Sequence, residues 1–284
     1  MIDLSKRIAI GCLLASLTAL VVHGQWLNYP TPGIPRTADG KPKLDTATPR
    51  LRNRRPDISG MWGDVCMNGS DCFATKSMFF DIMRGAPKPV DMTPWATEVQ
   101  QQRFARDKID NPYASCLPPG IPRMYFNNPF KIVVTSGSVV FLHESAVGST
   151  FRQVYTDGRA FPPVVDPTRL GYSIGRWEGD TFVVESRGFR DGLWLDTTFA
   201  RPTSDALRLT QRFTRTAFGH MLLSVTIDDP KAFVAPFTVT TNLMLQVDTD
   251  LLEGFCDNQK NILPHYSRQP GASDPPSPRT LPTP

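Results

Sequence analysis

The sequence has few residues that could hold a metal or a cofactor. It contains four histidines in 284 residues, and no His-x-His or His-Glu-x-x-His pattern occurs. No two cysteines have the Cys-x2-4-Cys spacing of a zinc site. The glycine-rich loops that bind nucleotide phosphates are also absent. The sequence therefore predicts neither a metal site nor a cofactor.

The chain also lacks a strong excess of charge of either sign. Its formal net charge is +4 at pH 7, and its basic residues form no run interleaved with aromatic residues. Such runs are typical of nucleic-acid-binding surfaces, so we expect no nucleic acid as a partner. Long apolar runs are absent after residue 22, so we expect no membrane span in the mature protein. The sequence does not indicate an oligomeric state.

The N-terminal residues have the order of a secretory signal. Lys6 and Arg7 precede an apolar run over residues 8–22, and Gly24 is a small residue suited to a cleavage site. The run is short for a membrane span, and retention as an anchor is the alternative. Cys12 precedes most of the apolar run, whereas a lipidated cysteine would follow it. We therefore expect residues 1–24 to be a signal peptide and the protein to be periplasmic or secreted.

Four cysteines follow the signal segment, namely Cys66, Cys72, Cys116 and Cys256. An even number of cysteines in an exported chain favours disulfides. Cys66 and Cys72 flank the turn residues Met-Asn-Gly-Ser-Asp, so local pairing is easy. That pairing leaves Cys116 with Cys256, a long loop whose closure removes more entropy from the unfolded chain. Four free buried thiols are the alternative.

The middle of the chain differs in composition from both ends. Residues 25–57 are rich in proline and arginine and show no period, so we expect an extended arm that can wrap the domain. Residues 264–284 are rich in proline and serine, a composition typical of disorder. Residues 58–263 are predicted to form a single β-rich domain.

The hydrophobic residues of this middle segment mostly follow the period of β-strands. Leu207, Leu209 and Phe213, for example, alternate with polar residues, and turn dipeptides such as that at 157–158 separate the segments. Strands are expected over residues 131–135, 138–143, 150–156, 172–177, 181–186, 207–215, 220–227 and 237–246. Their short connections favour neighbouring antiparallel pairs.

Helix signals are sparse. One helix is expected over residues 93–108, because Thr93 can cap it and Pro94 suits its first turn. One or two short helices beside eight strands predict a mainly β fold. We expect an antiparallel meander barrel or sandwich of lipocalin-like type, with disordered termini.

The segment Gly-Arg-Trp-Glu-Gly-Asp at 175–180 carries two nearby carboxylates, Glu178 and Asp180. Paired carboxylates that catalyse acid–base chemistry normally lie in a cleft that shifts their pKa values. These two instead flank Gly179 between strand-like segments, and glycine can adopt the positive φ of a tight turn. We therefore interpret the segment as a hairpin turn. A catalytic pair is the alternative.

Several segments resemble a family of exported bacterial proteins. They are Pro-Asp-Ile-Ser-Gly-Met-Trp at 56–62, Cys-Leu-Pro-Pro-Gly-Ile-Pro-Arg at 116–123, Asp-Gly-Arg at 157–159, Gly-Arg-Trp-Glu-Gly-Asp-Thr-Phe-Val-Val at 175–184 and Ile-Asp-Asp-Pro at 227–230. The resemblance covers roughly residues 56–258 and implies export and a β-rich domain, but no reaction. Members of the family often carry histidine where this chain has Tyr172, and a histidine-rich segment where it has residues 200–204. These departures argue against a shared histidine-based site.

A second resemblance concerns the start of the predicted domain. Gly60-Met61-Trp62 is similar to the Gly-x-Trp motif that opens lipocalin-like barrels. The resemblance implies that the indole of Trp62 closes one end of a barrel.

Candidates for catalysis are few. They are His143, His220 and Glu185, because a histidine beside a carboxylate in a cavity can move protons. His143 adjoins Glu144, but adjacent residues of a strand face opposite sides. Residues 171–175 have the Gly-x-Ser-x-Gly pattern of a hydrolase elbow around Ser173, but a strand follows it where the elbow needs a helix. The sequence leaves open whether the protein is an enzyme.

The polar faces of the predicted strands offer a candidate binding site. Arg152 can orient a ligand if it points into a barrel, with the ligand body resting on Tyr172, Trp177 and Phe182. Glu185, Arg208, Arg212 and His220 lie on comparable polar faces. We therefore predict an exported barrel that binds a small hydrophobic molecule. The alternatives are a cofactor-independent hydrolase, lyase or isomerase with a His/carboxylate pair in the barrel, and an envelope interaction module that uses the proline-rich ends.

Overall fold

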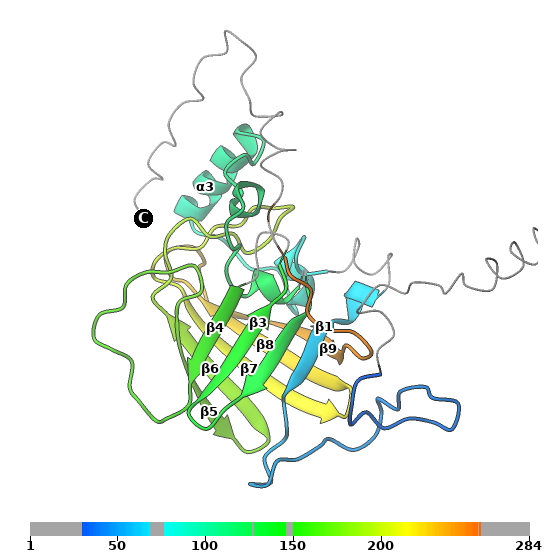
Figure 1. Ribbon diagram of the computed structural model, residues 1–284. Helices are drawn as coiled ribbons and strands as arrows, with labels where there is room; N and C mark the ends of the chain where they lie inside the picture. The colour runs from blue at the N-terminus through cyan, green and yellow to red at the C-terminus, as the bar shows by residue number, and fades with distance from the viewer. Residues whose placement is uncertain (1–29, 69–76, 127, 146–149, 255, 257–284) are drawn as a thin grey trace, which may run out of the picture.

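The strands of this protein close into a barrel (Figure 1). The computed structural model describes residues 30–68, 77–126, 128–145, 150–254 and 256. Within them, nine strands follow one another around the barrel in chain order, and the last pairs with the first. The prediction of a mainly β fold with a barrel is confirmed. The predicted signal peptide and the proline-rich tail lie outside the described residues.

Eight of the nine strands coincide with the predicted ones to within two residues at either end. The strands are β1 (Gly60–Asp64), β2 (Phe130–Val134), β3 (Ser138–His143), β4 (Thr150–Tyr155), β5 (Tyr172–Glu178), β6 (Thr181–Arg187), β7 (Arg208–Ala217), β8 (His220–Asp228) and β9 (Phe237–Leu245). The count of eight was wrong because β1 was missed. Its sequence, Gly-Met-Trp-Gly-Asp, contains two glycines, which weaken a strand pattern.

One α-helix occurs in the described part of the chain. It is α3 (Pro94–Ala105), and Thr93 caps it by accepting a hydrogen bond of 3.2 Å from the backbone N–H of Ala96. Four short 3-10 helices accompany it: η1 (Val65–Asn68), η2 (Ile82–Gly85), η3 (Pro112–Ser115) and η4 (Arg123–Tyr125). Among the described residues, no helix has the length and apolar character needed to cross a membrane.

The barrel departs from the predicted antiparallel meander at one position. The β4 and β5 strands pair in parallel, through Val154 with Ser173 and Tyr155 with Ile174, whereas their neighbours pair antiparallel. Because β4 and β5 run in the same direction, the segment 156–171 between them has to run back along the barrel before β5 begins.

The two ends of the barrel are closed by different parts of the chain. The hairpins β2–β3, β5–β6 and β7–β8 turn at one end, which we call the arm end because residues 30–57 contact it. We call the other end the helix end, because the long β1–β2 connection with η1–η4 and α3 begins and ends there. Figure 1 shows α3 beyond one end and the blue N-terminal segment beside the other.

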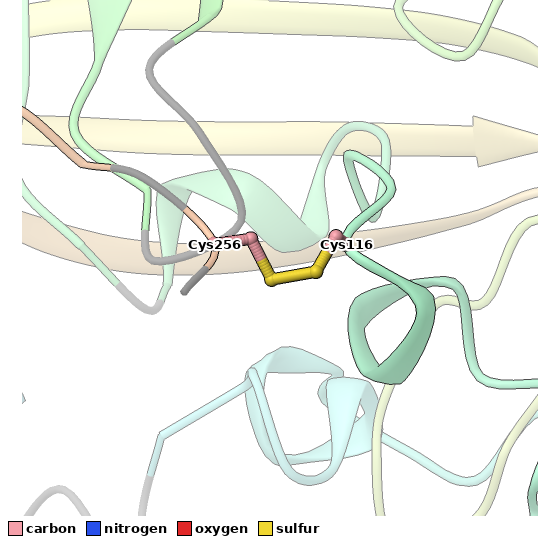
Figure 2. Close-up of a disulfide and its surroundings, with 2 residues drawn as sticks. All are labelled: Cys116 and Cys256. Atoms are coloured by element: carbon pink, nitrogen blue, oxygen red, sulfur yellow. A yellow bond between two sulfur atoms is a disulfide. The ribbon is translucent and has the colours of Figure 1, made fainter. Parts of the chain in front are cut away.

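A disulfide joins the β1–β2 connection to the chain that follows β9. Cys116 and Cys256 are bonded across 140 residues of sequence, as Figure 2 shows. This is the predicted long-range pair. Cys66 is also disulfide-bonded, and its predicted partner Cys72 lies outside the described residues.

Residues 30–57 form an arm against the barrel. Backbone N–H groups of the β7–β8 turn donate to it, from Phe218 to the carbonyl of Thr46 (2.8 Å) and from Gly219 to the carbonyl of Leu44 (2.7 Å). A side chain at position 219 would collide with Leu44, since a Cβ there would lie 2.4 Å from that residue. This glycine therefore permits the close approach of the arm.

The β5–β6 hairpin provides a second attachment for the arm. Gly179 has a φ of +59°, as the turn interpretation requires, and both carboxylates pair with arginines. Asp180 accepts two hydrogen bonds from Arg50 of the arm, at 2.9 and 2.6 Å, and Glu178 pairs with Arg176. Hydrogen bonds from Arg212 and then Arg176 lower the pKa of Glu178, and those from Arg50 lower the pKa of Asp180. The geometry is that of a turn that fastens the arm.

This geometry predicts unequal effects of two substitutions in the hairpin. Gly179→Val places a β-branched residue in a left-handed conformation and should lower the free energy of unfolding by about 1–2 kcal/mol. Asp180→Asn weakens only an exposed ion pair and should cost less. Chemical denaturation of both variants measures the difference. A stable, folded Asp180→Asn protein that has lost its ligand binding or turnover would show instead that the hairpin is a functional site.

Candidate functional site

Arg152 places a buried guanidinium in the interior of the barrel. It lies on β4 between the exposed Phe151 and Gln153, and the alternation of the strand turns it inward. All five of its N–H groups are used. Nε donates to Ser173 (3.1 Å), Nη1 donates to Gln211 (2.8 Å) and to the hydroxyl of Tyr125, and Nη2 donates to Ser173 (2.9 Å) and Ser186 (2.7 Å).

These acceptors are neutral side chains that come from different elements. Ser173 lies on β5, Ser186 on β6 and Gln211 on β7, while Tyr125 enters the barrel from η4. Burial lowers the pKa of the Arg152 guanidinium, and Tyr125 opposes that shift. The guanidinium also lies over the ring of Phe141, 5.6 Å from its centroid. Arg152 therefore ties four strands and the helix-end connection together.

Aromatic rings fill the interior around this cluster. Tyr125 contacts Phe130 and Phe141 at centroid distances of 5.1 and 6.1 Å. Phe213 lies 5.4 Å from Phe141 and 6.5 Å from Phe182. All five rings are fully buried. A ligand at Arg152 would have to displace Tyr125 or part of this packing, so the ligand role of Arg152 and Phe182 stays a prediction.

His143 lies inside the barrel without a hydrogen-bond partner. Its ring is 5.5 Å from that of Tyr125 and 5.6 Å from that of Phe130, and neither ring nitrogen has a partner among the described residues. Burial, and then the charge of Arg152, lower its pKa from 6.5 to about 3. His143 is therefore neutral at physiological pH, and no described carboxylate pairs with it.

Several other predicted site residues lie on the outer surface of the barrel. His220 pairs with the exposed Asp45 at the surface, at 2.9 Å, and Glu185 pairs with Arg176 at 2.5 Å. Tyr172 faces outward and stacks on Tyr155, with centroids 5.2 Å apart. The other polar-face candidates, Arg208 and Arg212, are exposed.

Trp177 lies at the arm end, half buried, with its ring 5.3 Å from that of Phe182. Ser173 lies within β5, hydrogen-bonded to Arg152 and 3.0 Å from Ser186. It is therefore part of the interior cluster, and a strand follows it as the sequence suggests.

A pocket lies between the arm and the barrel, with a volume of about 740 Å³. We call it the arm pocket. Its apolar lining comes from Pro32, Ile34, Pro49, Met61, Phe218 and Leu245. Its polar lining includes Asp57, Ser59, Lys131, Arg215, Gln246 and Asp250. The pocket is thus enclosed by the arm, by residues of β1, β2 and β9 and by the β7–β8 turn. Its lining combines apolar and polar side chains.

Arg215 is the most buried charged group of the arm pocket, with 6% of its surface exposed. Its guanidinium lies 4.9 Å from the ring centroid of Trp62 and donates to the carbonyls of Asp57 and Phe218. Burial lowers its pKa to about 10, which leaves it charged at neutral pH. The indole N–H of Trp62 donates to the carbonyl of Ile58 (3.0 Å). Trp62 and Arg215 thus pack together at the arm end, while the lipocalin-like role of the indole stays a prediction.

The lining of the arm pocket was missed at the sequence level, although one signal was present. The alternation that places Leu209 and Phe213 inward also places Gln211 and Arg215 inward, and the structure shows both buried. Gln211 and Arg215 are the polar members of this inward face. The contribution of the arm could not be found in this way, because residues 30–57 have no period.

No group of three or more His, Cys, Asp or Glu side chains that could hold a metal ion occurs among the described residues. No protein-family model and no curated protein matches the chain. The resemblance to exported bacterial proteins stays a prediction, and the site has to be argued from its own geometry.

The position of Arg152 predicts a large effect of its removal on stability. Arg152→Ala should lower the free energy of unfolding by about 2–5 kcal/mol, because it leaves a cavity and breaks buried hydrogen bonds. Arg208→Ala, on an exposed position of β7, is the matched control and should change little. Equal free energies of unfolding of the two variants in urea would contradict the role of Arg152 in holding the strands together.

The burial of His143 predicts a pH-dependent loss of stability. Its folded pKa, about 3, lies below the unfolded value of 6.5, so the unfolded chain takes up the proton first as the pH falls. The free energy of unfolding should therefore decrease between pH 6.5 and 3 by up to about 1.4 kcal/mol per pH unit from this residue. Above pH 6.5 it contributes nothing. His143→Phe should lack this component. Parallel pH profiles of the free energy of unfolding for the two proteins would refute the contribution of His143.

Proposed function

We propose that the protein is an exported binding protein for a small hydrophobic molecule, and that the ligand occupies the arm pocket. The observation that carries the proposal is the volume and lining of this pocket. Small-molecule sites typically enclose about 300–1,000 Å³, with apolar walls and a few polar groups that fix orientation. At about 740 Å³, with six apolar residues and a buried arginine, the arm pocket matches that description.

Two features support a binding role for this place in the fold. The barrel supplies one wall from Met61 and Leu245, whose strands are paired on both sides. The arm supplies the opposite wall from Ile34 and Pro49, and its hydrogen bonds to the β7–β8 turn hold it in position. A rigid wall facing a segment without regular secondary structure can accommodate a ligand while the barrel stays intact.

Export is supported by the order of charged, apolar and small residues at the N-terminus. It is also supported by the Cys116–Cys256 bond, because disulfides persist mainly in oxidising compartments. An enzymatic role lacks comparable support. In the described part of the barrel interior, His143 has no carboxylate partner, and His220 meets Asp45 at the surface.

The proposal is tested with a neutral apolar dye, N-phenyl-1-naphthylamine, whose fluorescence rises in apolar surroundings. We expect the dye to bind the full-length mature protein and to raise its melting temperature, because it binds the folded state only. Ile34→Glu places a charge in the apolar wall of the arm pocket. It should weaken dye binding by about tenfold or more, since an unpaired buried charge is strongly unfavourable.

The matched control is Val164→Glu, which adds the same charge at a valine that is 79% exposed and lies outside the pocket lining. Its dye affinity should equal that of the unmodified protein. Absence of dye binding, or equal losses in the two variants, would reject the arm pocket as the ligand site.

A further inference from the structure

We propose that Arg215 is the recognition group of the arm pocket and that the ligand carries an anionic head on an apolar body. This inference rests on the proposed function and adds the chemical class of the ligand. The shared chemistry is an oxyanion, such as a carboxylate or a sulfate, at the end of a hydrocarbon chain.

The first argument is the hydrogen bonding of the guanidinium. Arginine has five N–H donors. In Arg215, Nε donates to the carbonyls of Ala217 (3.4 Å) and Phe218 (3.0 Å), Nη1 to that of Asp57, and Nη2 again to that of Phe218. These bonds use three N–H groups, so two of the five have no acceptor among the described residues. Since Arg215 lines the arm pocket, a ligand can supply the acceptor.

The second argument is the balance of charge in the pocket. Lys131 is paired with Asp250 at 2.9 Å. One carboxylate oxygen of Asp57 accepts hydrogen bonds from the N–H and the hydroxyl of Ser59, at 2.9 and 2.6 Å. Arg215 forms no direct ion pair with a described carboxylate, although the charge of Asp57 partly opposes the lowering of its pKa by burial. Its hydrogen-bond partners are backbone carbonyls. It is therefore the cation of the pocket whose direct partners are neutral.

The third argument is geometric. The guanidinium is held between the rings of Trp62 (4.9 Å) and Phe218 (5.2 Å), so its orientation is fixed before a ligand arrives. Phe218 and the neighbouring Leu245 also belong to the apolar lining. An anionic head at Arg215 thus places the attached chain against apolar side chains, where its burial is favourable.

Three probes with ten carbon atoms each distinguish the head groups: decanoate, decyl sulfate and 1-decanol. Each is titrated against the mature protein by displacement of the neutral dye. We expect at least one anion to bind about tenfold tighter than the alcohol, the usual gain from a charge-assisted hydrogen bond. Preference for decanoate or for decyl sulfate then identifies the oxyanion.

The variant Gln246→Glu tests whether the anion is recognised in this pocket. It adds a negative charge to the lining while leaving Arg215, with its structural contacts to the arm end, in place. The affinity for the favoured anion should fall about tenfold and by more than that for 1-decanol, so the difference between the two affinities should shrink. Gln153→Glu, on the exposed outer face of β4, is the matched control and should change neither affinity.

Arg215→Lys provides a second readout because it keeps the charge but loses the planar fork. If this variant folds, the difference in affinity between the favoured anion and 1-decanol should decrease. Equal affinities of the three probes for the unmodified protein would overturn the inference and leave the proposed function standing. An anion preference that Gln246→Glu does not reduce would also overturn it. Failure of all probes and of the dye would reject both.

Discussion

The closure of the barrel depends on the junction of β4 and β5. These strands share only two residue pairs, so backbone hydrogen bonds alone hold the ring weakly at this point. Arg152 compensates from the inside, since its guanidinium bonds to side chains of β5, β6 and β7 and to Tyr125 of the helix-end connection. The neutral acceptors satisfy every donor, which is the condition under which a buried polar group is tolerated. The rings of Phe130, Phe141, Phe182 and Phe213 pack around this cluster together with aliphatic side chains.

The proposed ligand site lies at the arm end, outside this packed interior. There a second arginine, Arg215, donates to backbone carbonyls of the arm and of the β7–β8 turn and lies beside Trp62. The two arginines thus differ in the number of N–H groups that have no acceptor. All donors of Arg152 are used, whereas two donors of Arg215, which lines the arm pocket, have no acceptor among the described residues. This difference separates a structural cluster from a candidate site.

Two of the segments quoted for the predicted resemblance to exported bacterial proteins help to hold the structure together. In the Gly-Arg-Trp-Glu-Gly-Asp segment, Gly175 makes room for the ring of Phe182, since a Cβ there would lie 2.6 Å from it. Asp180 of the same segment binds the arm through Arg50. In Asp-Gly-Arg at 157–159, the guanidinium of Arg159 lies 3.8 Å over the ring of Tyr155 and fastens the β4–β5 connection.

The sequence by itself determined the local elements of this protein. Alternation and turn residues identified eight strands, Thr93 and Pro94 identified the start of α3, and glycine chemistry identified the turn at Gly179, because these features depend on neighbours in the chain. Only the tertiary structure decided the parallel β4–β5 pair, the inward direction of Arg152 and the outward direction of Tyr172 and His220. It also decided the arm pocket, whose walls come from residues about 180 positions or more apart, such as Ile34 and Arg215. The physical reason is that closing a barrel chooses which face of each strand is buried and which distant segments meet. A period in the sequence identifies two faces of a strand, but it does not say what lies opposite either of them.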